Sequence, residues 1–169
     1  MAYHITISGS YGTHLPCLIK AMSKTTGDVL ELGTGVFSTP YLHYQCMLSK
    51  RKLVSYENFN KWYRFLKLYK YDNPYHEVNF IDDFAKADID KPWDVVLLDQ
   101  TPDISRSIEA KRLKDLAKYI IIHDTMKRKE AQYGYDKLFP LFKYKTEWLG
   151  DDNPATVLSN LVDLKDFWL

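Results

Sequence analysis

Short apolar runs alternate with amphipathic or polar segments along the chain from residue 28 onward. Within each run the apolar residues are consecutive, which is typical of parallel strands that are buried on both faces. The runs predict five strands, at residues 28–32, 52–56, 76–81, 93–98 and 119–122. The segments before and between them predict helices at residues 13–25, 40–48, 58–69 and 104–117. This β-α-β rhythm predicts a parallel sheet with helices on both faces.

The last third of the chain predicts two strands of another kind. Residues 142–148 and 155–160 are strand-like, and the turn-forming cluster at 150–154 separates them. Two strands joined in this way predict an antiparallel hairpin that closes one side of the sheet. The expected fold class is therefore α/β, a Rossmann-like and mostly parallel sheet of about seven strands. We expect a single domain over residues 1–169, in which 1–25 form an N-terminal helix or lid segment.

Composition excludes several classes of protein. The 169 residues are 46% hydrophobic and 27% charged, which excludes a disordered chain. The formal charge is only +1, so the total gives no indication of nucleic-acid binding. In residues 62–71 aromatic side chains alternate with basic ones, as they do in binding sites for single-stranded nucleic acid. However, Trp62, Phe65, Leu66 and Tyr69 recur at helical spacing, so we favour a buried helical stripe with a solvated basic face.

The cellular location is predicted from what the sequence lacks. No apolar run approaches the ~20 residues of a membrane span, so we expect no membrane partner. The first residues do not have the basic and apolar regions of a secretory signal. The two cysteines, Cys17 and Cys46, are too few for a disulfide framework. We therefore expect reduced thiols and a cytoplasmic protein.

Each predicted strand is followed by a carboxylate. In open α/β sheets, ligands bind beyond the carboxyl ends of the strands, so these side chains are expected to share one rim. Singly, an acidic residue after a strand is ordinary, because Asp and Glu favour turns and helix starts. Five in register favour a site. The rim would hold Glu31, Glu57, Asp82 with Asp83, Asp99, and Asp124 after His123.

The glycine loop that follows the first strand narrows the choice of ligand. Residues 33–38 read GTGVFS and lack the third glycine of a dinucleotide fingerprint. A pyrophosphate here would also face Glu31, whereas the small residues Gly33, Thr34 and Gly35 would let the backbone approach an amino-acid group. The acidic rim suits a cationic cofactor rich in hydroxyl and amine donors, such as S-adenosylmethionine. Glu57 is placed to accept from a ribose diol, and Asp82 or Asp83 from the adenine amine.

Five segments, VLELGTGVFST, VSYEN, FIDDF, WDVVLLDQTP and YIIIHDT, resemble the successive motifs of class I S-adenosylmethionine-dependent methyltransferases. The first and last are most similar to the small-molecule O-methyltransferase branch. The resemblance implies that Glu31, Gly33, Gly35, Glu57 and Asp83 (or Asp82) bind the cofactor. It also implies that Ser38 or Thr39 caps the first helix near the methionine carboxylate. Two residues depart from the pattern: Phe37 replaces a small residue, and Gln100 stands where the branch often has histidine.

Methyl transfer to a hydroxyl needs alignment of the reactants and removal of a proton. Asp99 and Asp124, at the ends of adjacent strands, would share Mg²⁺, as in the cation-dependent O-methyltransferases. The alternative is that Asp99 orders the following loop and Asp124 caps the next segment. His123 is a candidate base, or a hydrogen-bonded structural residue. His14 would reach over the cofactor if the N-terminal segment forms a lid; otherwise it is a surface or capping residue.

These features predict methyl transfer from S-adenosylmethionine to an oxygen, or less favourably a nitrogen, of a small-molecule or sugar-like acceptor. The chain is almost all core, so specificity would come from its N-terminal residues, the 126–136 loop or a homodimer. One alternative is a non-catalytic module that binds an adenosyl ligand. A second is an NAD-dependent oxidoreductase, which the missing glycine disfavours. A nucleic-acid methyltransferase is a third, but residues 99–102 read DQTP and lack the Asn/Asp-Pro-Pro-aromatic motif.

Overall fold

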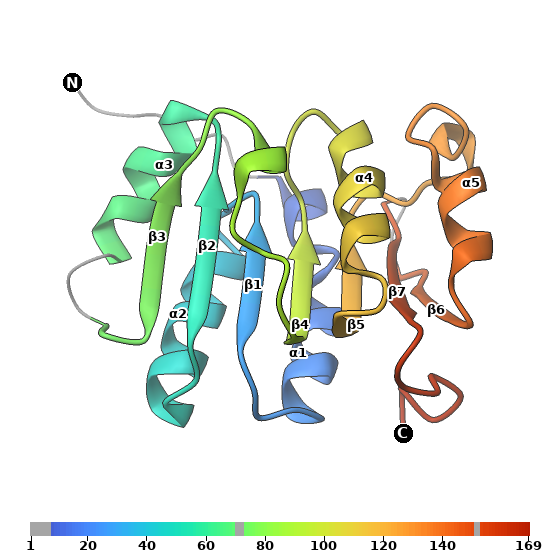
Figure 1. Ribbon diagram of the computed structural model, residues 1–169, viewed down its shortest axis with the longest axis horizontal. Coiled ribbons are helices and arrows are strands. Elements are labelled where there is room, and N and C mark those ends of the chain that lie inside the picture. The colour runs from blue at the N-terminus through green and yellow to red at the C-terminus, as the bar shows by residue number, and fades with distance from the viewer. Residues whose placement is uncertain (1–7, 70–72, 151–152) are drawn as a thin grey trace.

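The computed structural model describes residues 8–69, 73–150 and 153–169. Within them, seven strands form one sheet in the order β3-β2-β1-β4-β5-β7-β6 (Figure 1). The first five strands in sequence are parallel, and β7 lies antiparallel between β5 and β6. The strands are β1 Val29–Leu32, β2 Leu53–Glu57, β3 His76–Phe80, β4 Trp93–Leu98, β5 Ala117–Ile122, β6 Tyr144–Trp148 and β7 Ala155–Ser159. The predicted mostly parallel sheet and its antiparallel closing pair are confirmed.

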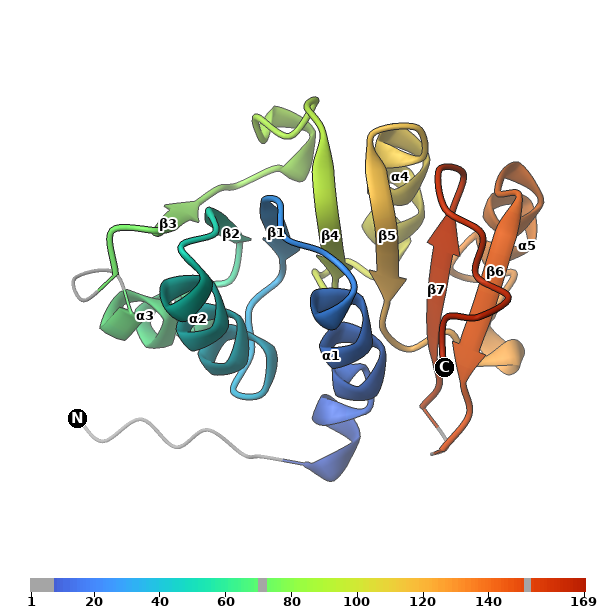
Figure 2. The same ribbon diagram turned by 90° about the horizontal axis from the view of Figure 1, so that it is seen from below.

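Helices cover both faces of this sheet, as predicted. Figure 2 shows α1 (Leu15–Ser23) and α2 (Ser38–Ser49) on one face, with α4 (Ile104–Leu113) and α5 (Tyr135–Leu138) on the other. The remaining α-helix, α3 (Asn60–Leu66), follows β2. Short 3₁₀ turns complete the described elements: η1 Gly9–Gly12, η2 Lys67–Tyr69, η3 Phe84–Lys86, η4 Lys127–Lys129 and η5 Phe139–Leu141. Among the described residues, no helix combines the length and hydrophobicity needed to cross a membrane.

The core is divided into two layers by the sheet, because successive strand residues point to opposite faces. Leu30 and Leu32 of β1 pack on the face covered by α4 and α5. Val29 packs on the other face, with Cys17 of α1 and Cys46 of α2. Both cysteines are buried and free, as expected. Glu31 lies between Leu30 and Leu32 in sequence, so its carboxylate points to the α2 face, where it is fully buried.

The helix after β2 differs from its prediction. It begins at Asn60 because the preceding residue, Phe59, is extended, and it ends at Leu66, where η2 follows. Leu66 is buried, whereas Trp62, Phe65 and Tyr69 are only partly buried. The expected stripe is therefore incomplete, since β3 is the edge strand and offers a helix little sheet to cover. Residues 70 and 71 of the aromatic-basic segment lie outside the described residues.

Candidate active site

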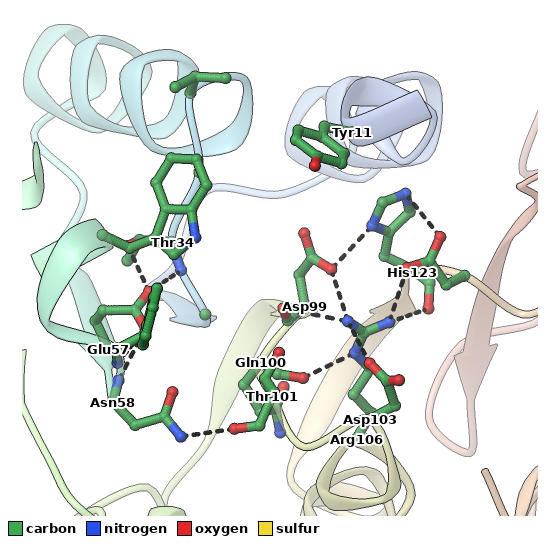
Figure 3. A pocket seen from close by; sticks show the side chains of 16 residues that line it. Tyr11, Thr34, Glu57, Asn58, Asp99, Gln100, Thr101, Asp103, Arg106 and His123 are labelled. Atoms are coloured by element: carbon green, nitrogen blue, oxygen red, sulfur yellow. Dashed lines mark hydrogen bonds and ion pairs between the residues drawn. The ribbon is translucent and has the colours of Figure 1, made fainter. Parts of the chain in front are cut away.

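A cavity of about 500 Å³ opens at the carboxyl ends of the central strands. Figure 3 shows Thr34 and Glu57 on one side of it and a cluster of charged side chains around Arg106 on the other. This is the edge of the sheet at which the sequence predicts a ligand site. The lining residues are Tyr11, Gly33, Thr34, Gly35, Val36, Glu57, Asn58, Phe59, Trp62, Asp99, Gln100, Thr101, Asp103, Arg106, His123 and Asp124.

The glycine loop leaves β1 through a conformation that only glycine adopts freely. Gly33 has φ +81°, and a Cβ there would clash with the backbone nitrogen of Gln100. The ends of β1 and β4 therefore approach each other closely, and this approach sets the floor of the cavity. The Gly35 N–H donates to Thr39 Oγ1 (3.1 Å), which ties the loop to the first turn of α2. Ser38 and Thr39 are buried behind the loop and do not line the cavity.

Glu57 lines the cavity, but its carboxylate already has four hydrogen-bond donors. The backbone N–H and the hydroxyl of Thr34 donate to Oε2, at 2.8 and 2.7 Å. The N–H groups of Asn58 and Phe59 donate to Oε1, at 2.9 and 2.8 Å. Burial raises the pKa of Glu57, and these bonds oppose the rise. Glu57 thus joins the glycine loop to the start of α3, and a ribose diol would have to replace some of these donors.

Glu31 supports the loop from beneath and is not a lining residue. Its Oε1 accepts from Thr39 Oγ1 at 2.9 Å, and its Oε2 accepts from Ser55 Oγ at 2.7 Å. Burial raises the pKa of this carboxyl to about 7, although the hydroxyl donors oppose the rise. The network continues from Ser55 to His76 Nε2, 2.9 Å away. The sequence predicts direct contact between Glu31 and a cofactor, but Glu31 lies under the loop and does not line the cavity.

Asp82 and Asp83 are not brought to the cavity. Asp82 pairs with Lys86 on the exposed surface at 3.0 Å, and Asp83 caps η3 by accepting from the Ala85 N–H. The chain turns toward η3 immediately after β3, the edge strand, so both side chains leave the rim. Phe59 and Trp62, which the sequence analysis did not assign to the site, line the cavity instead. The expected adenine contact of Asp82 or Asp83 is therefore not supported by their placement.

The charged cluster is organised by Arg106 of α4, whose side chain is 4% exposed. Its guanidinium pairs with the carboxylates of Asp99 (3.1 Å), Asp103 (3.2 Å) and Asp124 (3.3 Å). It also donates to the carbonyls of Gln100 and His123, each at 3.0 Å. Burial would raise the pKa of Asp99, but His123 and Arg106 lower it to about 2. Asp99 is therefore ionised, with its charge balanced inside the protein.

Arg106 was not among the site residues predicted from the sequence, because that prediction considered only the carboxylates at the strand ends. The signal was present: a rim of carboxylates needs a nearby positive charge, and Arg106 is the first basic residue after Asp99. In the structure this guanidinium lies between Asp99 and Asp124, the two residues expected to share Mg²⁺. A hard dication at that position would meet a fixed positive charge. The Asp99–Asp124 pair does not fit magnesium.

His123 connects the end of β5 to the N-terminal segment. Its Nδ1 is 2.9 Å from Asp99 Oδ1, and its Nε2 is 2.9 Å from Thr13 Oγ1 and 3.2 Å from the Ser10 carbonyl. Burial disfavours the charged imidazole, but Asp99 and Asp124 outweigh it and raise the pKa of His123. These contacts place η1, which carries Tyr11, at the cavity wall. The residues before Ser8 lie outside the described part of the chain, so the lid is described only in part.

His14 is not a surface residue; it occupies the N-cap position of α1, but its side chain makes no capping hydrogen bond. It is 1% exposed, and its ring meets that of His123 edge-on with 4.7 Å between centroids. Among the described residues, neither ring nitrogen has a hydrogen-bond partner. Burial lowers the pKa of His14 to about 4, so the ring is neutral.

A comparison with models of protein families found no match, and a comparison with curated proteins found no match either. Solved structures are similar in fold. Cofactor-bound Rv0187 from MTB is 18% identical, with TM-score 0.65, over 94% of this chain and 83% of that one. The O-methyltransferase from Bacillus cereus in complex with SAH is 16% identical, with TM-score 0.64, over 91% and 82%. The N-terminal domain of human METTL16, also in complex with SAH, is 13% identical, with TM-score 0.64, over 93% and 72%. The chain therefore has the fold of the class I S-adenosylmethionine-dependent methyltransferases.

Proposed function

We propose that this protein is an S-adenosylmethionine-dependent methyltransferase that acts on an oxygen, or less favourably a nitrogen, of a small-molecule acceptor. The observation that carries the proposal is the cavity at the carboxyl ends of the strands, where the Gly33–Gly35 backbone faces a rim of carboxylates. Two solved structures of the same fold are complexes with SAH, which supports the choice of ligand. When bound, S-adenosylmethionine would supply a methyl group on a positively charged sulfur.

The chain contributes orientation and charge to this reaction. The glycine loop, held by Glu57 and Thr39, offers a close backbone approach to the amino-acid part of the cofactor. Asn58, Phe59 and Trp62 follow Glu57 along the same wall and offer polar and aromatic surface to the adenosine part. On the opposite wall, Asp99, Asp103 and Asp124 favour a cationic ligand, although Arg106 balances part of their charge.

Among the residues that line the cavity, Asp99 is the best candidate for the proton acceptor. His123 and Arg106 both contact Oδ1 of Asp99, and Asp99 lines the cavity. His123 has acceptors at both ring nitrogens and is less available as a base. The low pKa of Asp99 makes it a weak base, so alignment of the acceptor would supply most of the acceleration.

The cavity at the carboxyl ends of the strands also supports a second candidate function, a non-catalytic module that binds an adenosyl ligand. Titration calorimetry with S-adenosylhomocysteine and with NAD tests ligand choice, and transfer of labelled methyl from S-adenosylmethionine to a panel of phenols, sugars and amines tests catalysis. Binding of S-adenosylhomocysteine together with turnover supports the enzyme, and binding without turnover supports the module. Preferential binding of NAD would refute both. The proposed homodimer is tested on the same sample by light scattering.

A further inference from the structure

The unpartnered ring of His14 lies beside two other metal-ligating side chains. His14, Asp99 and His123 each present a ligand atom, and these atoms all lie within 4.8 Å of one another. The three residues come from distant parts of the sequence: the segment before α1 and the ends of β4 and β5. A buried imidazole with neither nitrogen hydrogen-bonded is unusual, and an ion is one of the few things that satisfies it.

We propose that His14, Asp99 and His123 form a binding site for a divalent transition-metal ion of the zinc type. Two imidazoles and one carboxylate are the ligand set of open metal sites, in which three protein ligands leave a position for a further molecule. Ligand atoms around tetrahedral zinc lie roughly 3.4 Å apart, so the longest separation between these atoms would have to close by up to about 1.4 Å. Asp99 and His123 line the cavity, so the open position would face it.

The surroundings of the three ligands favour this assignment. His123 Nε2 faces the Ser10 carbonyl, which can only accept, so the Nε2–H tautomer leaves Nδ1 for the metal. The proton that Nδ1 now shares with Asp99 would leave to solvent when the ion binds. Asp99 keeps Arg106 on Oδ1, and its Oδ2 makes no hydrogen bond or ion pair within the described part of the chain. Each ligand other than His14 is thus oriented by an outer partner.

The chemistry of the site separates it from the Asp99–Asp124 pair considered above. Imidazole nitrogen suits zinc, cobalt or iron, whereas magnesium prefers an octahedron of oxygens. His14 approaches from the N-terminal segment, on the side of His123, while Arg106 occupies the space between the two aspartates. We therefore expect the protein to bind Zn²⁺ and Co²⁺ and not to bind Mg²⁺ at the same concentration.

The test is titration of the chelator-treated full chain with ZnCl₂, in the absence of cofactor. We expect one Zn²⁺ per chain, and at least a tenfold loss of affinity in His14→Gln, which keeps the size and polarity of the side chain. The control is Asp88→Asn, which removes a carboxylate charge at an exposed position outside the cavity, and which should change the affinity less than threefold. Circular dichroism establishes that each variant is folded.

A measurement on the unaltered protein keeps the test decisive if His14→Gln does not fold. Crystals soaked in Zn²⁺ should give an anomalous peak between His14, Asp99 and His123. Absence of zinc binding, equal affinity in His14→Gln and Asp88→Asn, or a peak elsewhere would overturn the proposal. Zinc binding does not require methyl transfer, and binding of S-adenosylhomocysteine to the same sample is measured separately. Failure of the zinc proposal therefore does not refute the proposed methyltransferase function, and failure of that function does not refute the zinc site.

Discussion

Replacing Arg106 with methionine tests whether this guanidinium organises the charged wall of the cavity. Methionine is unbranched like arginine and carries no charge, so the change removes the cation without inserting a polar group. The side chain is 4% exposed and pairs with three carboxylates at 3.1 to 3.3 Å. It also satisfies the carbonyls of Gln100 and His123. Breaking a buried ion pair from one side costs about 3–5 kcal/mol, because the other charges stay buried and uncompensated.

The free energy of unfolding is measured by urea titration, followed by the fluorescence of the four tryptophans. The matched control is Lys111→Met, which removes one positive charge at an exposed position of the same helix and should cost about 0.5 kcal/mol or less. The deficit of Arg106→Met should shrink in acid, since protonation of Asp99 removes an unbalanced charge. If the two variants unfold within about 1 kcal/mol of each other, Arg106 does not have this role.

Three further predictions concern the glycine loop and its supports. Gly33→Ala should cost about 1–3 kcal/mol of unfolding free energy, owing to the positive φ and the clash with Gln100, whereas Gly9→Ala, with open space around it, should be close to neutral; equal losses would contradict this. Glu57→Ala should weaken S-adenosylhomocysteine binding by ~1–3 kcal/mol in calorimetry, and unchanged affinity would refute its place in the site. For Glu31, the folded pKa of about 7 lies above the ordinary pKa of 4.5 for a glutamate, so its protonated form stabilises the fold below pH 4.5 and this contribution is lost as pH rises through 7. Relative to Glu31→Gln, the unaltered protein should lose about 3 kcal/mol of unfolding free energy between pH 4.5 and 8, and parallel pH profiles would show that Glu31 does not titrate in this way.

The sequence predicted the sheet well because burial on both faces leaves a strong local signal. The run at residues 93–98, for example, is wholly buried as β4. Gly33 was predicted at the loop because its turn is a local property of the chain. Asp99 and His123 were placed on the rim because the end of a strand fixes where the next side chain lies.

What the sequence did not predict depends on contacts between distant segments. Asp82 and Asp83 follow a strand as Asp99 does, but β3 lies at the edge of the sheet and its loop turns away. The burial of His14 depends on η1 docking against His123, which no local pattern encodes. The position of Arg106 depends on how α4 packs, so a helix prediction alone does not direct its side chain to Asp99.

The position of β7 has a consequence for synthesis on the ribosome. Among the described residues, β6 pairs with β7 and with no other strand, although β6 precedes β7 in the chain. In a nascent polypeptide that has emerged only as far as β6, this strand cannot yet pair with β7. The edge of β5 that pairs with β7 is unpaired as well. Both unpaired margins are then available for incorrect pairing until the final strand arrives. A release of the chain before residue 155 would remove the docking strand for β6 along with β7 itself.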